Sequence, residues 1–282
     1  MNLDNILKKI RLTEINPQIA ANEIEKFIVD TVISAKKQGA VLGLSGGIDS
    51  TIVAYLTRDA FQKYNENHPE NKLKLYGLIL PAKANKSEDS EDGVRVAESL
   101  GIEYEIIQIQ PIIETFRETL RGKVESDFDK GNLSSETRAI LLSREAAYRN
   151  SLVLGTGNKD EDYCLGYFTK RGDGAIDLSP IGELSKRQVR QLADYKGVTK
   201  DLVQRISTAG LWEGQTDEGE LGFSYLHAEI VVSGKDQGYS RDEIKEITQF
   251  GDIVDKVLNM HKNNQFKMHM PPVAKLSEEA KK

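Results

Sequence analysis

The sequence predicts an α/β fold, in which a doubly wound parallel sheet carries helices on both faces. From residue 17 to residue 154, short apolar runs of strand length alternate with segments of helical periodicity. Such alternation is typical of parallel sheets, because parallel strands need a helical crossover between them. The chain has 282 residues, of which 39% are hydrophobic, so it can bury a large core. Since no internal repeat or linker-like stretch divides it, we expect one domain over residues 1–282.

The order of the elements follows from the residues at their boundaries. Asn16 and Pro17 are typical of a helix start, where an N-cap precedes proline at the first helical position, and this helix is expected to reach about residue 38. Ser87 opens a later helix that Gly101 ends. Strands are predicted at residues 40–44, 73–80, 102–109 and 151–154, and further helices at 185–197 and about 240–262.

Two stretches without clear periodicity, residues 157–183 and 205–224, are polar and contain several glycines. Long loops inside a compact domain are often binding loops or lids, so we expect both stretches to contribute to function. The charged tail at 271–282 is expected to be frayed.

Charge and composition exclude several classes of protein. The 38 basic and 44 acidic residues give a net charge of −6, which argues against a nucleic-acid-binding surface. With Cys164 as its one cysteine, the chain can form no internal disulfide and no cysteine-rich metal site. The N-terminus has no signal-like pattern, and no apolar run reaches the roughly 20 residues of a membrane helix. We therefore expect a cytoplasmic protein that binds neither nucleic acid nor membrane.

The most informative segment is a glycine turn between the first predicted strand and the helix after it. It consists of Gly43, Leu44, Ser45, Gly46, Gly47, Ile48, Asp49 and Ser50. Backbone N–H groups at the start of a helix bind anions, and glycines let a phosphate approach the backbone closely. An aspartate beside such an anion needs a cation between them, so Asp49 is a candidate Mg²⁺ ligand. A plain strand-to-helix turn is the alternative, but the full S-G-G-x-D-S string favours a phosphate site.

This string differs from two common phosphate-binding motifs. No lysine follows the glycines as in G-x-x-x-x-G-K-S/T, and the spacing of the dinucleotide motif G-x-G-x-x-G is absent. The string resembles the signature of the ATP pyrophosphatases, which share an adenine nucleotide alpha hydrolase-like fold. The resemblance implies that ATP is cleaved between its α and β phosphates while a substrate oxygen is adenylated.

Further motifs resemble those of one family within this superfamily. They are G-T-G-N-K-D-E at 155–161, G-Y-F-T-K at 166–170, residues 172–177, L-S-K-R at 184–187, S-T-A at 207–209 with Q-T-D-E at 215–218, and H-K at 261–262. With the glycine turn they resemble the ammonia-dependent NAD synthetases over about residues 20–272. The resemblance implies a ligase that amidates deamido-NAD to NAD with ammonia and ATP, through an acyl-adenylate, and releases AMP and pyrophosphate.

The resemblance also implies roles for residues around ATP. The glycine turn from Gly43 to Ser50 would bind the phosphates together with Thr156, Lys186 and Thr208. Asp49 and Glu161 would hold Mg²⁺. One residue more than in many family members separates Glu161 from the lysine of the Phe-Thr-Lys motif, so Asp162 is the alternative ligand.

Substrate roles are implied for Arg138, Lys170, Asp177, His261 and Lys262, all toward deamido-NAD. The family's upstream arginine aligns with Glu136 here, and Arg138 is the candidate to replace it. His261 alone would be typical of a cation at a helix C-terminus.

Asp173 is the third residue predicted to be catalytic, after Asp49 and Lys186. The resemblance implies a role for Asp173 in handling ammonia, although an aspartate between two glycines is also typical of a turn.

Two rival functions stay open at this point. The first is another ATP-pyrophosphatase ligase, of the GMP-synthetase or tRNA-modifying kind; the single cysteine and the charge of −6 argue against a tRNA thiolase. The second is a non-catalytic nucleotide-binding module, which would lack the metal carboxylates that Asp49 and Glu161 supply.

Ammonia itself is the expected nitrogen donor. Glutamine-dependent relatives carry an added amidase domain, and neither the residues before the first strand nor those after His261 reach the roughly 50 residues of a domain. The resemblance further implies a homodimer. The helix at residues 17–38 is a candidate contributor, although packing against the core explains its apolar stripe equally well.

Overall fold

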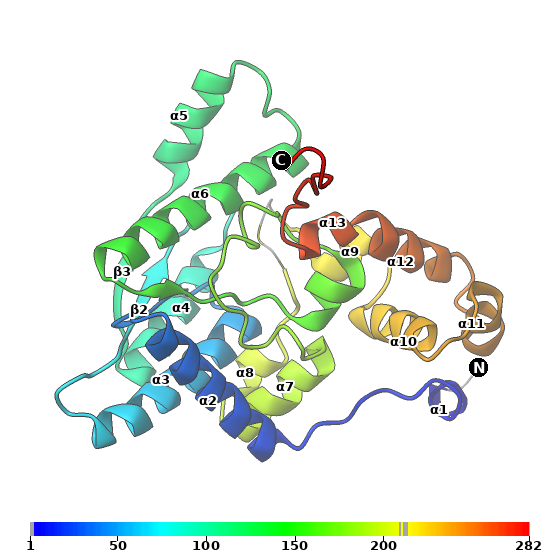
Figure 1. The fold of residues 1–282 in the computed structure, drawn as a ribbon, viewed down its shortest axis with the longest axis horizontal. Helices are drawn as coiled ribbons and strands as arrows, with labels where there is room; N and C mark the ends of the chain where they lie inside the picture. Colours follow the sequence, from blue (N-terminus) through cyan, green and yellow to red (C-terminus); the bar gives the residue numbers. More distant parts are fainter. Residues whose placement is uncertain (1–2, 209, 211–213, 282) are drawn as a thin grey trace.

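The computed structural model describes residues 3–208, 210 and 214–281, and at its centre lies a four-stranded parallel sheet (Figure 1). The strands are β1 (Gly39–Gly43), β2 (Lys74–Ile79), β3 (Glu103–Ile106) and β4 (Leu152–Val153), in the order β3-β2-β1-β4. Ala40 of β1 pairs with both Leu75 and Leu152, which fixes the register on its two sides. The central strand β1 therefore has its carboxyl end in the middle of the sheet edge.

Helices cover both faces of this sheet, as the alternation of elements predicts. On one face lie α2 (Pro17–Ser34), α3 (Ile48–Asn67), α4 (Ser87–Leu100), α7 (Lys186–Tyr195) and α8 (Lys200–Val203). On the other face lie α5 (Gln110–Leu120) and α6 (Asp127–Tyr148).

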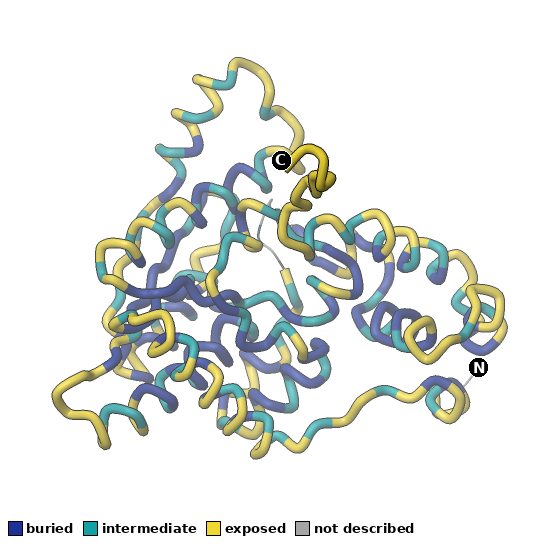
Figure 2. Tube along the Cα trace, viewed as in Figure 1, coloured by how far each residue is buried: buried dark blue, intermediate teal, exposed yellow. Residues whose placement is uncertain are grey.

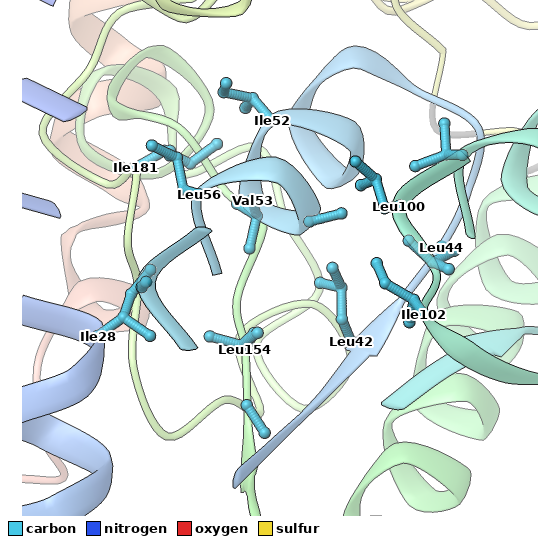
Figure 3. Close-up of a cluster of buried hydrophobic side chains, with 14 of the residues drawn as sticks. Ile28, Leu42, Leu44, Ile52, Val53, Leu56, Leu100, Ile102, Leu154 and Ile181 are labelled. Carbon is cyan, nitrogen blue, oxygen red and sulfur yellow. The ribbon is translucent and has the colours of Figure 1, made fainter. Parts of the chain in front are cut away.

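The side chains of β1 show how one strand supports both layers. Leu42 is fully buried in the larger core, together with Ile52, Leu56 and Leu154 (Figure 3). Its neighbour Val41 is fully buried in the core on the opposite face. A strand covered on both faces becomes apolar throughout rather than alternating, because each side chain meets a helix layer.

A further group of helices lies beside the sheet layers. It contains the π-helix η1 (Asp160–Leu165) and the helices α9 (Asp217–Leu221), α10 (Tyr225–Asp236), α11 (Arg241–Thr248), α12 (Asp252–Asn263) and α13 (Gln265–Met268). η1, α10 and α12 share a core of their own. The N-terminal helix α1 (Leu3–Leu7) reaches this group across an extended segment, and its buried Ile6 packs with Ile230 (Figure 1).

Several predicted boundaries are confirmed. The Asn16 side chain accepts hydrogen bonds of 3.1 Å from the backbone N–H groups of Gln18 and Ile19, so it caps α2 as expected. Gly101 ends α4 in the left-handed conformation, with φ of 65°. Buried residues follow the sheet and the inner helix faces, whereas residues 271–281 are exposed and contain no helix or strand (Figure 2).

Other boundaries differ from the predictions. The helix α2 ends at Ser34 rather than near residue 38, and Lys36 has a left-handed φ of 55°. The predicted strand at 102–109 is confined to Glu103–Ile106 at the sheet edge. The predicted helix at 240–262 is two helices, because Gln249 at φ 60° ends the first and Gly251 at φ 57° precedes the second.

Among the described residues, no helix combines the length and the apolar character needed to cross a membrane.

Candidate active site

The glycine turn lies where β1 ends and α3 begins, at the carboxyl edge of the sheet. Gly46 has a left-handed φ of 75°, and a Cβ atom there would lie 2.3 Å from the backbone oxygen of Asp89. Gly47 is the N-cap of α3 and has no side chain to cap the first N–H groups of the helix. These groups are therefore available to an anion, and the dipole of a 20-residue helix favours negative charge there.

Two serines hold the turn from within. The Ser50 hydroxyl donates to the Gly47 carbonyl at 3.1 Å, and the Ser45 and Ser50 hydroxyl oxygens lie 3.0 Å apart. The backbone N–H of Gly47 donates to the Ser45 hydroxyl at 3.3 Å. The turn is thus shaped before any ligand binds.

Asp49, Glu161 and Lys186 meet directly beside this turn. The Lys186 Nζ lies 2.6 Å from Asp49 Oδ2 and 2.8 Å from Glu161 Oε1, and the lysine side chain is 3% exposed. Burial alone lowers the pKa of the Lys186 ammonium, but the charges of Asp49 and Glu161 outweigh burial and raise it overall. Three segments far apart in the sequence therefore form one charged centre that keeps its proton at neutral pH.

Asn158 is a site residue that sequence reasoning missed. It is fully buried, and its side-chain amide donates to Asp49 Oδ1 at 3.1 Å. Its Oδ1 accepts the backbone N–H groups of Asp160 at 3.0 Å and Glu161 at 3.1 Å, as an N-cap residue does. Asn158 thus orients both carboxylates at once. The signal in the sequence is an asparagine two residues before an acidic run.

The π-helix η1 begins with three acidic residues in different surroundings. Burial raises the pKa of Glu161, although the charge of Lys186 opposes this shift. Burial also raises the pKa of Asp160 and of Asp162 to about 7. Glu161 shares Lys186 with Asp49, while Asp160 accepts the backbone N–H of Lys186 at 2.8 Å. Of the two candidates Glu161 and Asp162, the geometry favours Glu161 as the partner of Asp49.

A cavity of about 630 Å³ opens next to this charged centre. Its volume lies in the usual range for small-molecule sites, roughly 300–1,000 Å³. Most of the predicted site residues line it, namely Gly43, Leu44, Ser45, Gly47, Ile48, Asp49, Ser50, Arg138, Thr156, Glu161, Asp173, Lys186 and Thr208. Gly46, in the middle of the turn, does not line the cavity and lies against α4.

The four other predicted substrate residues do not line this cavity. The ammonium of Lys170 donates to the backbone carbonyls of Phe266 and His269. The buried His261 ring places Nδ1 3.0 Å from the Tyr163 carbonyl, and the next residue, Lys262, is exposed. In one chain, the Lys170 and His261 side chains therefore connect the C-terminal helices to the rest of the molecule.

Asp177 is the fourth of these residues. Its Oδ2 accepts the backbone N–H of Val153 at 2.8 Å, so the carboxylate supports the edge of β4. A bridge between Leu154 and Leu178 continues this edge.

Lys267 is a second missed residue, and it does line the cavity. Its ammonium donates to the carbonyls of Gly166 at 2.8 Å and Phe168 at 2.9 Å. Burial lowers its pKa, and the nearby charge of Asp173 opposes the shift. Because both carbonyl acceptors are neutral, the lysine charge remains available to an anionic ligand. The sequence offered a weak signal, a second lysine five residues after Lys262.

Arg138 and Asp173 lie on the same side of the cavity. Arg138 donates to the Leu80 carbonyl at 3.1 Å and to Asn85 Oδ1 at 2.8 Å, and burial lowers its pKa against the charge of Asp173. Asp173 accepts from the Ser135 hydroxyl at 2.8 Å and from the backbone N–H of Thr169 at 3.1 Å. Both charged groups are therefore held in fixed positions.

The stretch at 205–224 also reaches the site. The Thr208 hydroxyl donates to the Gln215 carbonyl at 2.8 Å. The hydroxyl of Tyr225 donates to Asp217 at 2.9 Å and lies 3.3 Å from Glu161. This stretch is thus connected to the carboxylate that faces Lys186.

Comparisons with known proteins decide the family. The sequence model of the NAD synthase family matches residues 20–271, most of the chain. The chain belongs to the NAD synthase family. An NH3-dependent NAD+ synthetase of Methanocaldococcus jannaschii is 40% identical over 260 residues, which cover 90% of this chain and 96% of that protein.

Two solved structures extend this likeness to the fold of NAD synthases. The NMN synthetase of Francisella tularensis superposes with a TM-score of 0.80 at 31% identity, and the superposition covers 93% of this chain and 100% of that protein. The NH3-dependent NAD synthetase of Campylobacter jejuni superposes with a TM-score of 0.75 at 30% identity, with the same coverage of 93% and 100%. The predicted α/β fold of the ATP pyrophosphatase type is confirmed.

Proposed function

We propose that this enzyme is a ligase that amidates deamido-NAD with ammonia and ATP, and releases NAD, AMP and pyrophosphate. One observation carries the proposal: the glycine turn, Asp49, Glu161 and Lys186 converge at one end of a cavity. Membership of the NAD synthase family, with NH3-dependent NAD+ synthetases among the relatives, supports this choice over other ligases of the superfamily and over a non-catalytic nucleotide-binding module.

Mg²⁺ belongs to the proposal, and Asp49 and Glu161 are the residues that would hold it. Their carboxylates converge on one cation, the Lys186 ammonium, so two hard oxygen donors already face a shared positive charge. Among the described residues, no three His, Cys, Asp or Glu side chains gather as a metal site. Mg²⁺ commonly uses one or two carboxylates and completes its shell with substrate phosphates and water. Bound there, it would neutralise charge on the phosphates.

The chain's own residues would act by orientation and charge. In the first step, a nicotinate carboxylate oxygen bonds to the α-phosphorus of ATP, and the bond between that phosphorus and the bridging oxygen of pyrophosphate breaks. The N–H groups of the glycine turn and the Lys186 ammonium stabilise the negative charge of the departing pyrophosphate. Thr156 and Thr208, both at the cavity wall, contact the nucleotide.

In the second step, ammonia bonds to the acyl carbon and the bond to AMP breaks. The nitrogen must lose a proton, and Asp173 is the carboxylate at the cavity wall proposed to hold incoming ammonium and to accept a proton. No covalent intermediate with a protein side chain is required.

Arg138 and Lys267 are proposed to bind the anionic groups of deamido-NAD, because both present a cation to the cavity. Lys267 thereby takes the role that the sequence resemblance gives to Lys262. We also propose a homodimer, in which Lys170, Asp177, His261 and Lys262, which do not line the cavity of one chain, would reach the substrate.

The helix α2, which the sequence analysis named as a candidate for the dimer interface, has exposed apolar side chains that a partner chain could cover. The side chains of Ile19, Phe27 and Ile33 are 54%, 45% and 42% exposed. Light scattering behind size exclusion at the concentration of the activity assay tests the assembly; a monomer with full activity would refute the dimer and leave the reaction untouched.

A product assay tests the reaction. Purified protein with Mg²⁺, ATP, deamido-NAD and ammonium chloride is expected to form NAD, AMP and pyrophosphate in equal amounts, and ADP with phosphate would contradict the proposal. Nicotinate mononucleotide serves as the second substrate arm, since an NMN synthetase is among the similar structures. Faster turnover of the mononucleotide would support the same amidation reaction but show that the mononucleotide, not deamido-NAD, is the preferred substrate.

A further inference from the structure

Arg205 lines the cavity and connects three parts of the molecule that meet beside the glycine turn. It lies two residues after the end of α8 and three residues before Thr208. One guanidinium nitrogen donates to the Gly46 carbonyl at 2.9 Å and to Asp92 of α4, and the other donates to Asp89 of α4 at 2.6 Å. The arginine side chain is 23% exposed, and the two carboxylates are 18% and 22% exposed.

The first turn of α4 lies unusually close to the glycine turn. A Cβ at Gly46 would lie 2.3 Å from the Asp89 backbone oxygen, and a Cβ at Gly93 would lie 2.9 Å from the Leu44 oxygen. Such contacts leave no room between the two segments. A planar guanidinium that bonds one carbonyl and two carboxylates fixes their relative position.

The carbonyl that Arg205 binds belongs to the peptide between the two glycines. Glycine on both sides lets that peptide rotate at little steric cost. In a trans peptide the carbonyl and the N–H point in opposite directions, so holding the Gly46 oxygen also sets the direction of the Gly47 N–H. That N–H donates to the Ser45 hydroxyl at 3.3 Å, so the orientation of this peptide also sets the position of Ser45 at the cavity wall.

Direct binding of phosphate by the Arg205 guanidinium fits these contacts less well. Asp89 and Asp92 both bond the guanidinium, so its positive charge is already neutralised. Its donors are also directed at protein oxygens rather than at the space over the turn.

We propose that Arg205 is a positioning residue: it holds the Gly46–Gly47 peptide in the orientation that accepts phosphate, and anchors residues 205–208 with Thr208 beside it. A second contact at the other end of this segment agrees, because the Asn85 side chain donates to the Gly210 carbonyl at 3.2 Å. The inference rests on the proposed use of ATP.

Arg95 offers a matched control for the test. It donates to the same Asp92 at 2.8 Å and to Asp201 at 2.6 Å, but it is 48% exposed and is not part of the cavity wall. Arg205→Gln and Arg95→Gln therefore each remove one positive charge that pairs with Asp92 of α4, and only the first removes the bond to Gly46.

The experiment combines binding, exchange and kinetics. For Arg205→Gln, we expect Kd for α,β-methylene-ATP with Mg²⁺ by calorimetry, and KM for ATP, to rise about 10-fold, the effect of losing one or two charge-assisted hydrogen bonds. KM for deamido-NAD should change less than about 2-fold. Amide hydrogen exchange in the peptide covering residues 43–50 should accelerate in the ligand-free protein. Arg95→Gln should leave all of these at wild-type values.

Three outcomes would overturn the proposal. Weaker ATP binding with unchanged exchange at residues 43–50 would make Arg205 a direct phosphate ligand. Equal effects of Arg205→Gln and Arg95→Gln would show that Arg205 only stabilises α4. Unchanged ATP binding in Arg205→Gln would show that Arg205 has no role in ATP binding. Calorimetry and exchange need no turnover, so they decide the role of Arg205 even if wild-type protein forms no NAD.

Discussion

The two ends of the cavity are built differently. At the end proposed to bind phosphate, Lys186 contacts both Asp49 and Glu161. Asp49 and Lys186 lie on α3 and α7 of the sheet layers, and Glu161 lies on η1. At the substrate end, Arg138 and Lys267 bond mainly to backbone carbonyls, and Lys267 lies on α13, close to the exposed C-terminal tail. The first end is a closed network of charges, and the second presents cations with uncommitted charge.

This difference separates two kinds of task. A charge network that must meet phosphates in one orientation gains from rigid supports, because electrostatic stabilisation costs no reorganisation when its groups are fixed in advance. A site for a large dinucleotide needs cations that can exchange neutral carbonyl partners for ligand oxygens. Mutations at the two ends should therefore differ in kind: loss of turnover at the first, loss of substrate affinity at the second.

The largest effect is expected for Asp49→Asn. This change removes one negative charge from the Lys186 centre and a proposed Mg²⁺ ligand, so kcat should fall by about 10²-fold or more while the protein folds normally. Steady-state kinetics at saturating Mg²⁺ measure it. Turnover close to wild type would show that Asp49 has no role at the phosphates.

Asp59→Asn is the matched control for that substitution. Asp59 lies ten residues further along α3 and pairs with Lys196, ten residues beyond Lys186, so both aspartates join α3 to the α7 region in the same way. Asp59 lies outside the cavity wall. Its substitution should lower the melting temperature and leave kcat unchanged.

The position of the glycine turn could be predicted from the sequence because its geometry is local. A strand, a glycine turn and a helix N-terminus define the position of Gly43 to Ser50 without knowledge of the rest of the chain. Asn158 was missed because its role depends on Asp49, more than 100 residues away in sequence.

The substrate end depends on tertiary packing that sequence patterns do not reveal. Which of Lys262 and Lys267 faces the cavity is decided by how α12 and α13 pack on η1. The helix α10 has its buried residues spread around its circumference, so it gives little periodic signal, and the sequence analysis did not predict it.

Lys267→Ala tests the substrate end directly. We expect KM for deamido-NAD to rise about 10-fold, with KM for ATP changed less than about 2-fold, because one charge-assisted contact to an anion is lost. Lys262→Ala is the control in the same region. A larger effect of Lys262→Ala would mean that the dinucleotide binds outside the cavity of a single chain, at a dimer surface.

A smaller effect, on stability rather than turnover, is expected behind the phosphate end at Asp160. Burial raises its pKa from 3.8 to about 7, so the folded state holds this proton more tightly than the unfolded state does. The stabilising contribution of the protonated group is complete below about pH 4 and is lost as pH rises through about 7. Asp160→Asn can still accept the Lys186 N–H and has no proton to lose.

The melting temperatures of both proteins are measured in EDTA. The difference between them, Asp160→Asn minus wild type, should therefore increase as pH rises from 5 to 8. The gain should be about 2–4 °C, the shift that about 1 kcal/mol produces in larger domains. Glu161 and Asp162 titrate in both proteins, so the difference isolates Asp160. A difference that is constant over this pH range would show that Asp160 is ionised throughout.

The smallest effect on catalysis is expected for Cys164→Ser, and it tests the nitrogen donor. Cys164 lies on η1 and does not line the cavity: it is 2% exposed, and its thiol donates to Asp160 Oδ1 at 3.8 Å. Burial raises the pKa of this thiol well above its ordinary value, so it stays protonated and cannot attack glutamine. With ammonium chloride near pH 8.5, NAD formation by Cys164→Ser should stay within about 2-fold of wild type, since an inert buried thiol takes no part in the reaction. With ammonia-free glutamine, both proteins should form no NAD. Glutamine-dependent NAD formation that Cys164→Ser abolishes would identify a nucleophile here and overturn the assignment of ammonia as the donor.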